Sequence, residues 1–140
     1  MMEKVFIDTD VALDLLTKRG PHYAYAASLF TLADKNKIRL NISSLSFSNL
    51  NYIVSREVGF KEARKILLDF KVLVQVLSVD DKIIHLALNS AFTDLEDAIQ
   101  HFTAVEHGLP LIITRNIKDY KKSELPVSTA EAFIKERSGK

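Results

Sequence analysis

The sequence predicts an α/β fold of three layers, with helices on both faces of a central, mainly parallel sheet of four to five strands. Short apolar runs alternate with segments of helical periodicity along the chain. The run at 111–113 is apolar at every position, which is typical of a parallel strand covered on both faces. The chain has 140 residues with only 4 glycines and 3 prolines. We therefore expect a single domain over residues 1–140, without a linker.

The first half of the chain contains two predicted strands and four predicted helices. The strands lie at 5–7 and 38–42, and the helices at 9–16, 22–36, 44–57 and 61–70. Gly20 and Pro21 break the first helical pattern. Ser43 or Ser44 offers an N-cap for the third helix, and Gly59 separates that helix from the fourth.

The second half continues the alternation. Strands are predicted at 72–77, at 111–113 and near 127, and helices at 80–90, at 94–107 and from 128 onward. Ser78 and Asp81 have the spacing of a capping box, and Thr93 and Glu96 form a fuller one. Gly108 stands where a C-cap is expected.

Composition excludes several classes of function. There are 19 basic and 18 acidic side chains, so nucleic acid could be bound only through a local basic patch. The absence of cysteine excludes disulfides, thiolate zinc sites and cysteine nucleophiles, and it fits a reducing compartment. No apolar run approaches the ~18 residues of a membrane span. We expect a cytoplasmic protein without a membrane partner.

Acidic and polar side chains follow the predicted strands or begin the helix before the fourth one. They are Asp8, Asp10, Asp14, Asp94, Asp97, Thr114, Asn116 and Asp119. The carboxyl ends of parallel strands form the ligand-binding edge of such sheets. Crowded carboxylates repel one another unless a cation lies among them, and oxygen ligands select Mg²⁺ or Mn²⁺. Such an ion activates water and neutralises phosphoryl charge, so phosphodiester hydrolysis is the reaction class expected.

Several of these acids also have simpler interpretations. Asp8 and Asp94 can cap helices, and Asp10 is favoured in a first turn by the helix dipole. Asp14 is expected on a solvated face, and Glu96 is explained by its capping box.

Three segments resemble the motifs of PIN domains. The segment 7–16, IDTDVALDLL, resembles their opening L-D-T-N-V. The segment 93–100, TDLEDAIQ, is similar to their central D-x-E-D-A-x-Q, and 113–120, ITRNIKDY, to their closing T-R-N-x-x-D-F. The resemblance spans nearly the whole chain and implies a PIN fold, as in VapC-like toxins. It implies a Mg²⁺- or Mn²⁺-dependent endoribonuclease that leaves a 5′-phosphate and a 3′-hydroxyl, a homodimer and a cognate antitoxin.

The resemblance also assigns site residues. It implies metal binding by Asp8, Asp97 and Asp119 and a catalytic role for Asn116, where many relatives carry aspartate. Asn49 stands where the family places a glutamate, on one helical stripe with Leu45 and Ile53. An amide can offer an oxygen to a cation but brings no charge. Asn49 is therefore either a neutral helper in the site or a hydrogen-bonded core amide, and the alternative function is a catalytically weakened module that binds RNA or protein.

A basic run lies beside Asp119. It comprises Arg115, Lys118, Lys121 and Lys122, and we expect it to contact the phosphates of RNA. The alternatives are a solvated loop and, for Asp119, an ion pair with Lys118 or Lys122. A phospho-receiver domain also gathers aspartates at strand ends, but two-helix crossovers and the lack of Lys-Pro after the last strand argue against it.

Overall fold

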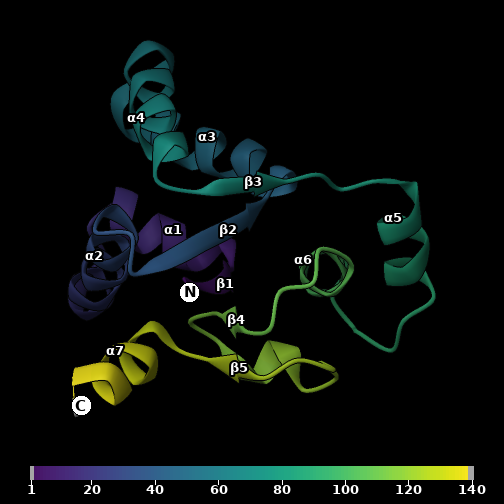
Figure 1. The fold of residues 1–140 in the computed structure, drawn as a ribbon. Coiled ribbons are helices and arrows are strands. Elements are labelled where there is room, and N and C mark those ends of the chain that lie inside the picture. The colour runs from purple at the N-terminus through teal and green to yellow at the C-terminus, as the bar shows by residue number, and fades with distance from the viewer. Residues whose placement is uncertain (1, 139–140) are drawn as a thin grey trace.

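The structure, a computed structural model, describes residues 2–138. A five-stranded parallel sheet has the order β3-β2-β1-β4-β5 (Figure 1). The strands are β1 (Glu3–Ile7), β2 (Ile38–Ser43), β3 (Gln75–Leu77), β4 (Ile112–Ile113) and β5 (Val127–Ser128). The predicted parallel α/β sheet is confirmed, and β2 and β4 flank the central strand β1.

Seven α-helices and one 3-10 helix surround the sheet within residues 2–138. They are α1 (Thr9–Leu16), α2 (Gly20–Asp34), α3 (Ser44–Val58), α4 (Phe60–Val72), α5 (Asp81–Leu88), α6 (Leu95–Glu106), the 3-10 helix η1 (Ile117–Tyr120) and α7 (Ala130–Ser138). Each of the first three crossovers carries two helices, as predicted. In Figure 1, α2 and α7 lie on one side of the sheet and α6 with α5 on the other.

Strand β1 explains the layering, because its side chains alternate between two cores. Val5 and Ile7 pack in the cluster of α1, α2, α3, α4 and α7, whereas Phe6 packs on the opposite face with Ala104 of α6. Val5, Phe6 and Ile7 are fully buried. A strand apolar on both faces occupies the centre of a covered parallel sheet.

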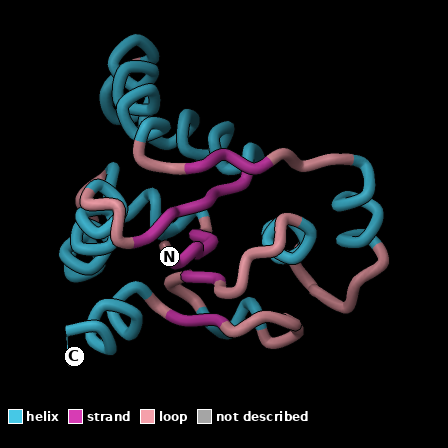
Figure 2. Tube along the Cα trace, viewed as in Figure 1, coloured by secondary structure: helices cyan, strands magenta, loops and turns pink. Residues whose placement is uncertain are grey.

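Helix α5 reaches outward from this frame. Figure 2 shows the loops that lead from β3 to α5 and from α5 to α6. Ile83 and Ala87 of α5 pack against Ala98 and Ile99 of α6. These contacts hold α5 against α6.

The structure corrects three local predictions. Helix α4 continues to Val72, so the third strand is shorter than the predicted 72–77. The N-cap of α5 is Asp80, whose carboxylate accepts the N–H of Ile83 at 3.0 Å, rather than Ser78. The N-cap of α6 is Asp94, rather than Thr93. In both caps a carboxylate closer to the helix replaces the expected hydroxyl.

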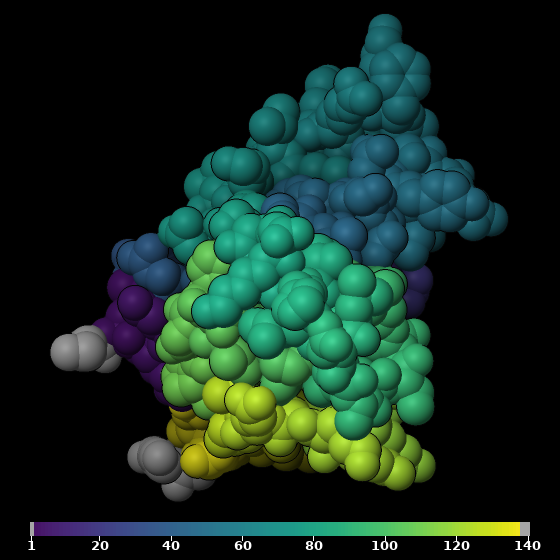
Figure 3. All heavy atoms as spheres, turned by 90° about the vertical axis from the view of Figure 1, so that its right-hand side faces the viewer, coloured from purple at the N-terminus to yellow at the C-terminus, as the bar shows by residue number. Residues whose placement is uncertain are grey.

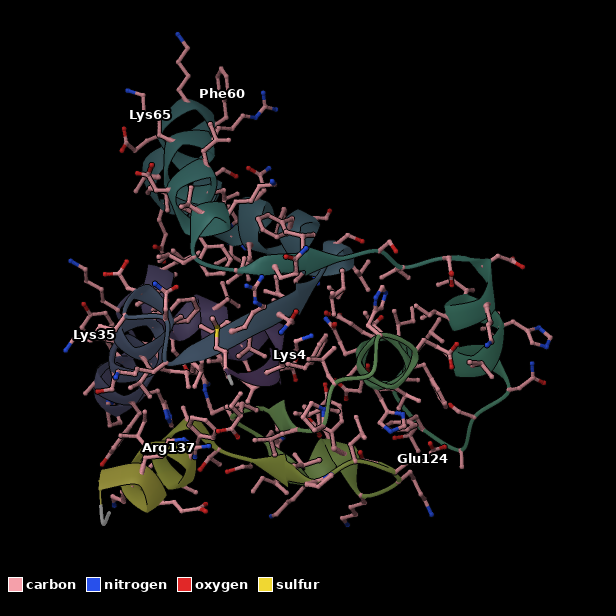
Figure 4. The ribbon with its side chains drawn as sticks, viewed as in Figure 1. Lys4, Lys35, Phe60, Lys65, Glu124 and Arg137 are labelled. Atoms are coloured by element: carbon pink, nitrogen blue, oxygen red, sulfur yellow. The ribbon has the colours of Figure 1, made fainter. Side chains whose placement is uncertain are left out.

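Helices α3 and α4 form a hairpin that projects from the rest of the molecule (Figure 3). Gly59 joins them with φ 88° and ψ 163°, a conformation that only glycine adopts readily. Phe60 and Lys65 point away from the sheet at the outer end of α4 (Figure 4). Within residues 2–138, every helix is too short or too polar to span a lipid bilayer.

Candidate active site

The carboxyl ends of β1 and β4 bring two predicted site residues together. Ile7 pairs with Ile113, and the N–H of Asp8 donates to the carbonyl of Ile113 at 2.9 Å. Asp8 and Thr114, the residues that follow these strands, therefore lie side by side. The sheet register alone accounts for this contact between residues at opposite ends of the chain.

Asp8 is the most firmly held acid of the site. It is only 9% exposed and caps α1, with Oδ1 accepting the N–H of Thr9 at 2.7 Å. Its Oδ2 accepts the hydroxyls of Tyr120 at 2.9 Å and Thr114 at 3.0 Å. Burial raises the pKa of Asp8, against the effect of these hydrogen bonds, and the charge of Asp119 adds to the rise. The predicted helix cap is confirmed, and the same carboxylate lies at the carboxyl end of β1.

Asp10 and Asp14 interact with the residue that follows Thr114. Both carboxylate oxygens of Asp10 lie 3.2 Å from the N–H of Arg115. Burial and the charge of Asp8 raise the pKa of Asp10 to about 7, although Arg115 opposes the rise. The prediction that Asp14 is solvated is wrong: it is 3% exposed and forms an ion pair with the Arg115 guanidinium. That ion pair engages the guanidinium with α1.

Asp97 stands on the opposite side, in the first turn of α6. Its N–H donates to Oδ1 of the helix cap Asp94 at 2.9 Å. Partial burial, followed by repulsion from Asp94, Asp8 and Asp119, raises the pKa of Asp97 to about 7. Carboxylates contributed by three segments of the chain therefore repel one another here. We call Asp8, Asp97 and Asp119 the acidic mouth.

The donors of the acidic mouth suit a hard divalent cation. All of them are oxygens, and a cation would remove the repulsion that raises the pKa of Asp97. Within residues 2–138, no three Asp, Glu or His side chains are gathered closely enough to enclose an ion by themselves. Mg²⁺ does not require such a cage, because it commonly binds one or two carboxylates and keeps several water ligands.

Asn49 and Glu96 meet across two helices beside the acidic mouth. The Asn49 amide, on α3, donates to Oε1 of Glu96, on α6, at 2.7 Å. Glu96 was expected to complete a capping box, and this prediction is wrong because Asp94 caps the helix. Burial and repulsion from Asp8 and Asp94 raise the pKa of Glu96, whereas the hydrogen bond from Asn49 lowers it. Asn49 is half-buried and its partner Glu96 is exposed, so this hydrogen bond lies at the surface and Asn49 is not a core amide.

A groove of about 380 Å³ opens between α6 and η1. It is lined by Ala91, Phe92, Thr93, Asp94, Asp97, Lys118, Asp119, Lys121 and Lys122. Two acids of the mouth and three lysines of the basic run thus share one surface. No ion pair between Asp119 and Lys118 or Lys122 is found in the part of the chain that the structure describes. Asn116 precedes η1 and is exposed.

A buried polar contact lies directly behind the acids. The Thr9 and Ser46 hydroxyls are 2.6 Å apart, and the Gln100 amide nitrogen lies 3.1 Å from each oxygen. Gln100 is fully buried and stands one helical turn after Asp97, as Ser46 stands one turn before Asn49. This contact joins α1, α3 and α6, so it sets the spacing of the helices that carry the site residues.

Sequence reasoning missed several of these contacts. Tyr120 was given no role beyond its place in the closing motif, and the ion pair of Asp14 with Arg115 links positions 101 apart. The sequence around Asp14 and the sequence around Arg115 contain no pattern from which this pairing could be predicted. The position of Tyr120, directly after Asp119 in the closing motif, was the one available signal for its role.

The chain is similar to known proteins in both sequence and fold. Residues 4–118 match the family described as PIN domain. The chain is 30% identical over 139 residues to ribonuclease VapC1 of Aquifex aeolicus (strain VF5), covering 94% of this chain and 93% of that protein. Its fold is similar to that of VapBC2 from Rickettsia felis bound to a DNA fragment from their promoter, with a TM-score of 0.68 and 18% identity over 90% of this chain and 98% of that one. It is also similar to VapC20 of Mycobacterium tuberculosis, a sarcin-ricin loop cleaving toxin, with a TM-score of 0.65 and 14% identity over 84% and 94% of the two chains.

Proposed function

The chain belongs to the PIN domain family, and from this premise we propose that it is an endoribonuclease that hydrolyses RNA phosphodiester bonds with Mg²⁺ or Mn²⁺. The observation that carries the proposal is the mutual repulsion of Asp8, Asp97 and Asp119 at one end of the sheet. A protein gains nothing from crowded acids unless a cation or a proton offsets their charge. A relative along nearly the whole chain is a ribonuclease, which supports RNA as the substrate.

Asp8, Asp97 and Asp119 would hold the ion, with Asn116 and Asn49 as neutral helpers. When bound, a divalent ion polarises a phosphate and lowers the pKa of a water molecule. The hydroxyls of Thr114 and Tyr120 orient Asp8 by donating to its Oδ2. That carboxylate is thereby held in one rotamer before a ligand arrives.

The lysines of the groove would contact the RNA backbone. Lys118, Lys121 and Lys122 line the same groove as Asp97 and Asp119, which supports a role in contacting the phosphates that would flank the scissile bond. Arg115 belonged to the expected contact set, but its guanidinium is held by Asp14. We therefore propose that the Arg115 side chain mainly stabilises α1 by pairing with Asp14. Only its backbone, at the edge of the site, would be available to RNA.

We further propose that the protein is the toxin of a toxin–antitoxin pair and acts as a homodimer in the cytoplasm, where its RNA substrate lies. Similar folds include a toxin–antitoxin complex from Klebsiella pneumoniae. The hairpin of α3 and α4 exposes large apolar side chains, which are common at protein interfaces. They are Tyr52, Val58, Phe60, Leu68 and Val72.

A second candidate function rests on Asn49. Because position 49 carries an amide where the resemblance leads us to expect a glutamate, the acidic mouth has fewer charges. A weakened site would leave a PIN-fold module that binds RNA or protein without cutting.

Cleavage of RNA by purified protein separates the two candidates. We expect the wild type to cut RNA with Mg²⁺ or Mn²⁺ and not with EDTA, leaving 5′-phosphate ends. Asp97→Asn should abolish cutting and leave the melting temperature equal or higher, because it removes a repelled charge. RNA binding without cutting by the wild type would favour the module, and unchanged cutting by Asp97→Asn would refute the site assignment.

A further inference from the structure

The side chain of Glu96 forms a hydrogen bond that the start of helix α6 does not need. Asp94 already caps α6 and accepts the N–H of Asp97, so the helix start needs no second carboxylate. The side chain of Glu96 nevertheless reaches across to α3, where the Asn49 amide donates to its Oε1 at 2.7 Å. Glutamate loses rotamer freedom when it is fixed in this way. The contact is therefore separate from the cap of the helix.

The hydrogen bond has a definite polarity. An amide nitrogen is only a donor, and a carboxylate is only an acceptor, so Asn49 offers its Nδ2 and leaves Oε2 of Glu96 without a hydrogen bond to the residues that the structure describes. One oxygen is anchored and the other is available. Glu96 stands four residues before Gln100 on α6, and Asn49 stands three residues after Ser46 on α3. The pair therefore lies one helical turn from the contact that Gln100 and Ser46 make with Thr9, the residue that follows Asp8.

We propose that Glu96 is a further acid of the site, which Asn49 positions and which supplies the negative charge that position 49 itself lacks. Its available oxygen would serve the divalent ion held by Asp8, Asp97 and Asp119, directly or through a water ligand. This inference rests on the proposed function. It removes the argument for a weakened site, because the carboxylate has moved from α3 to α6 rather than disappeared.

Exchanging the two side chains tests the inference. Glu96→Gln removes the charge but keeps the size of the side chain. Asn49→Glu alone places a second carboxylate against the first, and the double variant Asn49→Glu/Glu96→Gln restores an amide–carboxylate pair with the partners reversed. Glu62→Gln, on the projecting helix α4, is the matched control for loss of a surface charge. Each variant is measured for Mn²⁺ affinity by calorimetry, for RNA cleavage and for melting temperature.

We expect Glu96→Gln to weaken Mn²⁺ binding and cleavage by about 10- to 100-fold. Asn49→Glu should not improve either quantity, and the double variant should recover most of the loss. The control should match the wild type. Glu96→Gln with wild-type Mn²⁺ affinity, a double variant as impaired as Glu96→Gln, or a wild type without Mn²⁺ affinity would overturn the inference. If the Mn²⁺ pattern holds but the wild type cuts no RNA, the inference stands and the proposed function fails.

Discussion

The acidic mouth is built from two walls that hold their acids in different ways. On the inner wall, at β1 and β4, Asp8 is buried and accepts hydrogen bonds from a backbone N–H and two hydroxyls. On the outer wall, at α6 and α3, Asp97 and Glu96 are more exposed, and Glu96 is anchored by the single bond from Asn49. The inner wall supplies fixed geometry, and the outer wall supplies negative charge that little in the protein offsets.

This difference shows how a folded protein can remain stable with a cluster of like charges. Hydrogen bonds stabilise the carboxylate that must not move, while partial exposure lets water moderate the repulsion among the others. The pKa of Asp97 nonetheless rises to about 7, so the compensation is incomplete. A cation that binds at the outer wall would complete it. On the proposed function, the inner wall contributes to the fold and the outer wall would receive the cation.

The largest expected effect is a difference in the free energy of unfolding between substitutions in the inner wall and in the outer wall. Asp8→Ala removes a helix cap and leaves the Tyr120 and Thr114 hydroxyls without their partner, so it should lower the free energy of unfolding by about 2 kcal/mol. Asp97→Ala removes a repelled charge and should leave that free energy equal or higher. Urea unfolding at pH 7.5 without divalent ions measures both variants. Equal destabilisation by the two substitutions would remove the distinction between the walls.

The pH dependence of stability should come from both walls. The pKa values of Asp10 and Asp97 are raised to about 7 in the folded protein, above the usual aspartate value near 4. Between pH 4 and pH 7 the folded state therefore binds more protons than the unfolded state, and stability falls as pH rises through this window. We expect a loss on the order of 1 kcal/mol from pH 5 to pH 8, after allowance for the exposure of Asp97.

Asp97→Asn should remove part of this slope. Urea unfolding from pH 5 to pH 8 in EDTA gives the slope for the wild type and the variant. A stability that rises with pH over this range would contradict the assignment of the raised pKa values.

Tyr120→Phe sharpens the comparison within the inner wall. The change removes one hydroxyl donor from Asp8 while the ring stays buried against Phe92. We expect a loss of about 1 kcal/mol in the free energy of unfolding, together with a further rise in the pKa of Asp8. The acidic limb of the pH profile of cleavage should move to higher pH. A variant with wild-type stability and pH profile would show that Thr114 and the Thr9 backbone suffice to hold Asp8.

The smallest effect on the fold is expected outside both walls. Lys121→Gln/Lys122→Gln should leave stability unchanged, because both side chains are exposed. It should weaken RNA binding and reduce the slope of log affinity against log salt by up to about 1.4, or about 0.7 for each phosphate contact to a single strand. Fluorescence anisotropy of labelled RNA in increasing salt measures the slope. An unchanged slope would show that these lysines do not contact the phosphates of RNA.

Much of the fold was predictable because its signals are local. Residues 5–7 and 111–113 are apolar without interruption, so each run predicted a buried strand, and the run at 111–113 one covered on both faces. The register then placed Asp8 beside Thr114. The position of Asp97 in the first turn of its helix was likewise predicted. Caps were less reliable, since Asp80 and Asp94 compete with nearby hydroxyls for the same helix starts.

Contacts between distant side chains were not predictable in this way. Glu96 had a sufficient local explanation as a capping residue, and only the packing of α3 against α6 reveals its partner Asn49. Asp14 was likewise predicted to be a surface residue, but in the structure it forms an ion pair with Arg115, 101 positions away. A lone polar residue in a helix carries no information about the charge that tertiary structure brings to it.

The central claim, that the acidic mouth is a divalent cation site, is tested most directly by thermal melting at pH 7.5 with and without Mn²⁺. A ligand that binds the folded state alone raises the melting temperature. The account predicts that Mn²⁺ raises the melting temperature of the wild type, with little or no rise in Asp97→Asn. Equal shifts in the two proteins, or no shift in the wild type at millimolar Mn²⁺, would contradict it.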